Sequence, residues 1–147
     1  MASVDVSSEI DILAAPADIA AVMFDPEREP EWMSAVTKVE LIERALAPGA
    51  RVKRSGTFLG RPITWMTTVE MLHFPHVLAL RLDDGPFEGL VRYDIQRAGA
   101  GSRVRIRNIA TLAPSDAPAA AVAGPMREAL AADLARLKKI VETTSSP

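Results

Sequence analysis

The chain contains no cysteine, which excludes disulfide bonds, thiolate catalysis and cysteine metal sites. It also lacks the glycine-rich loop of P-loop NTPases, the GxGxxG sequence of dinucleotide-binding folds, and the HExxH and GxSxG sequences of zinc proteases and serine hydrolases. We therefore expect no nucleotide, no metal and no other cofactor. A chain without cysteine is compatible with the reducing cytoplasm, where we expect this protein.

Strong charge imbalance and long apolar runs are absent as well. The formal net charge is −2, so electrostatics give no reason to expect nucleic acid or an anionic membrane as a partner. No stretch reaches the roughly 20 apolar residues of a membrane span, and residues 1–12 do not resemble a signal peptide. The 147 residues fit a single domain over residues 1–147, in which we expect 143–147 to form a disordered tail.

The strongest pattern lies near the C-terminus, where Gly124–Glu142 is predicted to form one long helix. On a helical wheel of about 100° per residue, the apolar side chains share one arc that is wide enough to pack on a sheet. Pro125 suits the first turn of such a helix. A longer helix that begins near Asp116 and kinks at the Gly–Pro pair is the open alternative. The arc contains Met126, Leu130, Leu134, Leu137, Ile140 and Val141, with Asp133 among them.

Most of the remaining chain alternates apolar and polar residues with the period of a β-strand. A first strand, Val4–Ile12, is followed by a short helix that opens at Pro16 and by a second one from Asp25 to Trp32. The later strands are separated by short turns rich in Gly, Pro and Asp, which favour antiparallel neighbours. These strands are Val36–Arg44, Arg51–Leu59, Ile63–His73, Val77–Leu82, Phe87–Arg97 and Arg103–Leu112.

This order of elements predicts an α+β fold. A curved antiparallel sheet of about seven strands would wrap around the long C-terminal helix, because both elements have one apolar face to bury. The two short helices after the first strand would close one end of the sheet.

Several short motifs, in this order and spacing, resemble the START-like (SRPBCC) superfamily over essentially the whole chain. The resemblance implies the helix-grip fold of the polyketide cyclase/dehydrase-like proteins. It also implies a hydrophobic ligand, such as a lipid, sterol or polyketide, held between the sheet and the long helix. The motifs are Ala15-Pro16, Trp32-Met33 with Val36 and Val39-Glu40, Pro48-Gly49, Trp65 with Val69-Glu70, Pro75, Gly85-Pro86-Phe87, Tyr93, Ser102-Arg103-Val104, and Leu134 to Lys138 with Glu142.

Strand alternation also assigns the residues that face the interior. The inner positions are mostly apolar, and the polar exceptions are Arg54, Thr67, Tyr93, Asn108 and Asp133. An apolar pocket with a few directed polar groups is the usual form of a small-molecule site. We expect Trp32 near the mouth and Met126 and Leu130 toward the ligand. The full set of candidate ligand-binding residues is Trp32, Arg54, Phe58, Trp65, Thr67, Tyr93, Asn108, Met126, Leu130 and Asp133.

Asp133 and Arg54 are ionisable residues on apolar faces, and a buried charge needs a partner or must become neutral. Asp133 could anchor a ligand or act as an acid or base, or it could pair with a sheet residue such as Arg54 or reach solvent. Arg54 could bind a ligand carboxylate or phenolate, or extend out to solvent. Asn108 and Thr67 could orient a polar group of the ligand or bond to each other.

Two further groups of polar residues have an ordinary structural interpretation beside a functional one. His73 and His76 flank a predicted hairpin turn, and no third metal ligand is evident. Arg103, Arg105 and Arg107 form a basic stripe that could meet an acidic partner. We favour instead a solvated outer face balanced by acidic residues on neighbouring strands.

Three functions are compatible with these observations. The first is binding of a small, mostly hydrophobic molecule, such as a lipid or polyketide. The second is a polyketide cyclase/aromatase or dehydratase-type enzyme, whose candidate catalytic residues are Asp133, Arg54, Asn108 and Tyr93. The third is an interaction module whose pocket is filled by side chains. A homodimer is also possible, and the fold alone does not decide among these functions.

Overall fold

The computed structural model describes residues 3–58, 60–84, 87–112 and 119–145. The strands are β1 (Ser3–Ile12), β2 (Val36–Leu41), β3 (Arg51–Phe58), β4 (Arg61–His73), β5 (Val77–Asp84), β6 (Phe87–Ala98) and β7 (Gly101–Leu112). The helices are α1 (Pro16–Met23), the 3-10 turn η1 (Pro26–Arg28), α2 (Glu29–Trp32) and the long α3 (Ala119–Ser145).

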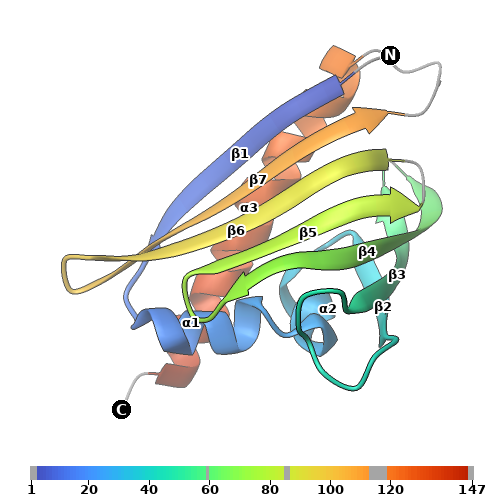
Figure 1. Ribbon diagram of the computed structural model, residues 1–147. Helices are drawn as coiled ribbons and strands as arrows, with labels where there is room; N and C mark the ends of the chain where they lie inside the picture. Colours follow the sequence, from blue (N-terminus) through green and yellow to red (C-terminus); the bar gives the residue numbers. More distant parts are fainter. Residues whose placement is uncertain (1–2, 59, 85–86, 113–118, 146–147) are drawn as a thin grey trace.

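The strands form one antiparallel sheet in the order β1-β7-β6-β5-β4-β3-β2. Every chain neighbour from β2 to β7 is also a sheet neighbour, as the short predicted turns require, and β1 closes the order beside β7. The sheet curves, and α3 runs across its concave face (Figure 1). This arrangement confirms the predicted helix-grip fold.

The short helices lie at one end of the sheet, next to the C-terminal half of α3 (Figure 1). Proline at the start of α1 and η1 sets the backbone angle of the first helical residue. The Asp25 side chain caps η1 by accepting a hydrogen bond from the Glu27 backbone N–H at 3.0 Å. The predicted second short helix is thus two consecutive pieces, η1 and α2.

Helix α3 begins earlier than residue 124 and includes Pro125 in its interior. Pro125 is therefore not the first-turn residue that we expected, and residues 119–124 belong to the helix. At the other end the helix extends to Ser145, so residues 143–145 of the expected tail are helical. Residues 113–118 and 146–147 lie outside the described residues. Among the described residues, no helix is long and apolar enough to cross a membrane.

Inner and outer faces follow the predicted alternation on most strands. On β3, for example, Val52, Arg54 and Gly56 are buried, whereas Arg51 and Lys53 are exposed. Alternation along β4 places Met71 on the same inner face as Thr67 and Val69, but Met71 is instead 39% exposed. The register between β4 and β5 shifts between Val69 and Met71. An irregularity of this kind changes the direction in which the following side chains point.

The basic stripe on β7 lies on the outer face and is balanced by acids on β1, as predicted. Arg103 pairs with Asp11, Arg105 with Glu9, and Arg107 with Asp5. These side chains are about half exposed, so water and salt screen each pair and its contribution to stability is small.

The interior between sheet and helix has two parts. Toward α1 and α2, apolar side chains such as Ile19, Met23, Ile95, Leu134 and Leu137 are fully buried and in contact. Toward the N-terminal half of α3, the side chains leave a space, which is the candidate site.

Candidate functional site

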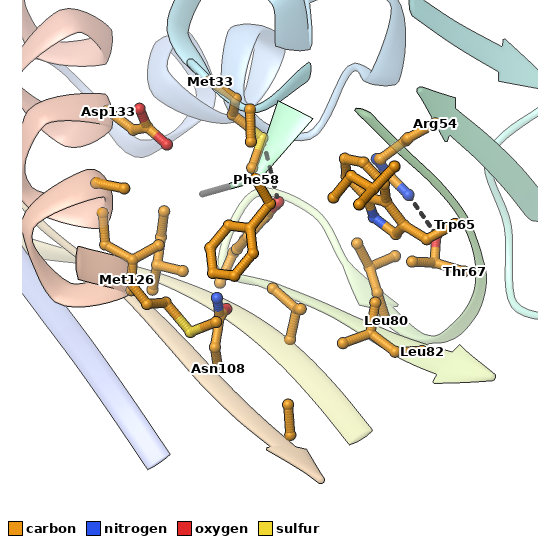
Figure 2. A pocket seen from close by; sticks show the side chains of 18 residues that line it. Met33, Arg54, Phe58, Trp65, Thr67, Leu80, Leu82, Asn108, Met126 and Asp133 are labelled. Atoms are coloured by element: carbon orange, nitrogen blue, oxygen red, sulfur yellow. Dashed lines mark hydrogen bonds between the residues drawn. The ribbon is translucent and has the colours of Figure 1, made fainter. Parts of the chain in front are cut away.

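A cavity of about 130 Å³ lies between the sheet and the N-terminal half of α3. Strands β3 to β7 form its floor and sides, α3 forms one wall, and the segment between α2 and β2 adds Met33 and Ala35. Its walls are predominantly apolar, and Figure 2 shows the ring of Phe58 among the lining side chains. Of the ten candidate ligand-binding residues, those that line it are Arg54, Phe58, Trp65, Thr67, Tyr93, Asn108, Met126, Leu130 and Asp133.

Arg54 is held by a carboxylate that the sequence did not reveal. Its Nε donates to Glu29 Oε1 at 2.6 Å, and its Nη2 donates to Glu29 Oε2 at 2.7 Å. A third hydrogen bond runs from Arg54 Nη1 to the Thr67 hydroxyl. Glu29 and Arg54 are 2% and 3% exposed. Arg54 therefore neither extends out to solvent nor pairs with Asp133, which were two of the expected alternatives.

Burial and the charge of Glu29 shift the pKa values of Arg54 and Tyr93. Burial by itself would lower the pKa of Arg54, but the charge and hydrogen bonds of Glu29 outweigh it and raise the pKa above its ordinary value. Burial and the Glu29 charge raise the pKa of Tyr93, so its phenol stays neutral at physiological pH. The Tyr93 hydroxyl donates to Met33 Sδ at 4.0 Å, a long and weak contact.

Asp133 joins α3 to the segment that follows α2. Its Oδ1 accepts a hydrogen bond from the Ser34 backbone N–H at 3.1 Å and another from Arg136 Nη2. Arg136 also donates from Nε to the Trp32 carbonyl at 3.0 Å. Burial raises the pKa of Asp133, and the bonds from Ser34 and Arg136 oppose this rise without cancelling it. Asp133 lines the cavity and is only 4% exposed.

Asn108 places an amide in an otherwise apolar ladder on β7. Its register partners are Val91 on β6 and Val6 on β1. Figure 2 shows the amide pointing into the cavity, toward the ring of Phe58. Asn108 Oδ1 is buried and has no hydrogen-bond partner among the described residues. Asn108 and Thr67 do not bond to each other, since Asn108 Oδ1 has no partner in the described part of the chain, and the Thr67 hydroxyl instead accepts from Arg54 Nη1.

Trp32 does not line the cavity, and our expectation that it lies near the mouth is wrong. It is fully buried, and its indole ring packs edge-to-face against Tyr93 with ring centroids 6.2 Å apart. Trp32 thus supports the wall behind Tyr93. Its place at the end of the second short helix had suggested the mouth, but the side chain is fully buried.

The two histidines lie away from the cavity, at the β4–β5 turn. His76 Nδ1 is 2.8 Å from the Ile95 carbonyl oxygen, a contact that ties the turn to β6. In the part of the chain that the structure describes, no group of three or more His, Asp or Glu residues could hold a metal ion.

Comparisons with known proteins agree with this architecture. A family model described as polyketide cyclase / dehydrase and lipid transport matches residues 1–142. No curated protein sequence shows a significant match to the chain.

Three solved structures share this fold over nearly their whole length, although their sequences are at most 20% identical to this chain. The TTHA0849 protein of Thermus thermophilus is 20% identical, with a TM-score of 0.83 over 97% of this chain and 100% of that one. A START superfamily protein of Mycobacterium smegmatis is 18% identical (TM-score 0.82; 96% and 99% covered). The Zhui aromatase/cyclase of Streptomyces is 14% identical (TM-score 0.81; 98% and 96% covered). Because the family model matches nearly the whole chain, the chain belongs to the polyketide cyclase / dehydrase and lipid transport family.

Proposed function

We propose that this protein binds one small, mostly apolar molecule in the cavity between α3 and the sheet. The observation that carries the proposal is the cavity itself, whose walls are apolar and carry a few inward-facing polar groups. An apolar cavity of about 150 Å³ is large enough for a benzene-sized molecule. At about 130 Å³, this cavity fits a ligand of one or two rings rather than a long lipid chain.

The ionisable groups favour binding over catalysis. The charge of Arg54 is matched by Glu29, and Asp133 is engaged by Ser34 and Arg136. A general acid or base needs a proton that it can exchange with the substrate, and an occupied side chain is poorly suited to this. One observation still favours a cyclase or dehydratase as the second candidate, since Asp133 lines the cavity and has a raised pKa.

The third function, an interaction module with a filled interior, receives less support. A space of about 130 Å³ is larger than the packing defects of an ordinary core, which seldom exceed the size of a water molecule. We also place the protein in the cytoplasm as part of this proposal, because a chain without cysteine needs no oxidising compartment.

Native mass spectrometry of the protein as purified, before and after addition of 2-naphthol, tests the proposal. We expect a complex with one bound molecule of either a co-purified ligand or the added probe. The Ala129→Phe variant fills the cavity from α3 and should abolish the complex. The matched control is Ala131→Phe, on the exposed face of the same helix, which should bind as the wild type does. Equal binding by both variants would place the ligand elsewhere and refute the proposal.

A further inference from the structure

The cavity wall carries a hydrogen-bond acceptor without a donor among the residues that the structure describes, and this unsatisfied acceptor points to the chemistry of the ligand. Asn108 Oδ1 is a buried hydrogen-bond acceptor that no described residue satisfies. A buried acceptor without a donor is unfavourable, and a ligand that supplies the donor removes this penalty. The neighbouring side chains Val91 and Val6 cannot supply one, since both are aliphatic.

Positive charge, by contrast, is already compensated. Among the described residues, the ionisable side chains that line the cavity are Arg54, Tyr93 and Asp133. Arg54 is paired through two hydrogen bonds with Glu29, and Tyr93 is a neutral phenol. Asp133 is itself a carboxyl group, and its partner Arg136 has a side chain that is 43% exposed.

We propose that the ligand is an uncharged molecule of one or two rings that carries a hydroxyl or N–H donor, which Asn108 Oδ1 accepts, and that the cavity excludes carboxylates. This inference rests on the proposed binding function and adds the class of ligand. A carboxylate would lose its hydration in an apolar space beside Asp133 without gaining an unpaired cation. The presence of an arginine in the wall had suggested the opposite preference, and its pairing with Glu29 reverses it.

Three probes with the same two-ring skeleton test separately the need for a donor and the exclusion of a carboxylate. They are 2-naphthol, which carries a donor, 2-methoxynaphthalene, which lacks it, and 2-naphthoate, which is an anion. Their affinities for the wild-type protein are measured at pH 7 by titration calorimetry. We expect 2-naphthol to bind about tenfold more tightly than its methyl ether, which is the effect of one buried hydrogen bond. We expect 2-naphthoate to bind at least a hundredfold more weakly than 2-naphthol, because of the unpaired buried charge.

The Asn108→Leu variant tests whether Asn108 Oδ1 is the group that accepts the hydrogen bond from the ligand. It should reduce 2-naphthol affinity about tenfold, to the level of the methyl ether, while the affinity for the ether stays unchanged or rises. Thr111→Leu is the matched control, since Thr111 lies on the same strand and its register neighbours place it on the opposite face. It should leave all three affinities unchanged. A melting curve establishes that each variant is folded.

The outcomes distinguish this inference from the function on which it rests. Equal affinity for the three probes, or tighter binding of 2-naphthoate, overturns the ligand class and leaves a hydrophobic binding site. Failure of all three probes to bind refutes the binding function and the ligand class together. If Asn108→Leu does not fold, the wild-type ranking of the three probes still decides.

Discussion

Glu29 and Arg54, which are 25 residues apart, face each other in the interior and are joined by two short hydrogen bonds. The pair connects α2 to β3, and through Thr67 it reaches β4. Each partner compensates a charge that would otherwise be buried alone, so the pair fixes the position of the short helix over the end of the sheet. It also removes Arg54 from the groups available to a ligand.

Glu29→Gln should destabilise the protein by about 3–5 kcal/mol, because it leaves Arg54 charged and buried without its counter-ion. Urea unfolding monitored by circular dichroism measures this loss. Glu31→Gln is the control: Glu31 pairs with Arg28 at the surface, and its loss should cost less than about 1 kcal/mol. Equal costs for the two substitutions would show that the buried pair has no special role in stability.

Asp133→Asn should change stability in a pH-dependent way. Burial raises the pKa of Asp133 in the folded state, so the folded protein holds this proton more tightly than the unfolded chain does. The stability that Asp133 contributes to the wild type is therefore present below the ordinary aspartate pKa. It is lost as the pH rises from that value through the raised pKa. In Asp133→Asn the side chain cannot ionise, so this pH-dependent loss of stability does not occur.

The stability of Asp133→Asn relative to the wild type should consequently increase between pH 4 and pH 7. Chemical unfolding at both pH values checks this. The control is Asp18→Asn, at an exposed position of α1, which should change stability by less than about 0.5 kcal/mol at both pH values. A relative stability of Asp133→Asn that falls toward pH 7 would mean that the carboxylate is stabilised in the fold, contrary to the burial argument.

Phe58→Ala should enlarge the cavity and admit a larger ligand. Phe58 lines the cavity and is partly buried, so we expect a stability cost of about 2 kcal/mol, below that of a fully buried phenylalanine. Affinity for a three-ring probe such as 9-anthracenemethanol, measured by fluorescence titration, should rise at least tenfold. Phe74→Ala, at an exposed turn, should not change it. If both variants behave alike, the ring of Phe58 does not limit the ligand.

Gly56→Ala should destabilise the protein by about 3 kcal/mol, at the upper end of overpacking effects. A Cβ atom at residue 56 would lie 1.6 Å from the Ala35 carbonyl oxygen, so β3 and the segment that enters β2 would have to separate. Thermal unfolding measures the effect. Ser55→Ala, the adjacent substitution on β3, should cost less than about 1 kcal/mol. A melting temperature for Gly56→Ala equal to that of the wild type would contradict this close approach.

Period-two alternation was sufficient to predict the fold and most of the cavity wall, because a sheet with one buried face imposes that pattern on every strand. It placed Arg54, Tyr93 and Asn108 inside correctly. It failed at Met71, where an irregular register with β5 changes the direction of the side chain. It could not decide whether Pro125 begins α3, since a proline is compatible with a first turn and with a kinked helix.

Glu29 was missed for a physical reason. A four-residue helix is too short to show a periodicity, so Glu27, Glu29 and Glu31 are equivalent in the sequence although Glu29 alone of the three is buried. The available signal was Arg54, whose position on an inner face requires a carboxylate nearby. Asp133 was considered for that role, but Arg136 lies one helical turn away on the same helix and is its nearer partner.

The central claim is that a small apolar molecule occupies the space between α3 and the sheet, and methyl chemical-shift mapping by NMR tests it most directly. On titration with 2-naphthol, we predict saturable shifts confined to lining side chains such as Leu80, Leu82, Ile106, Met126 and Leu130. The exposed methyl groups of Leu13, Ile42 and Ile109 serve as internal controls and should not move. Shifts at these exposed groups with none in the cavity would contradict the account.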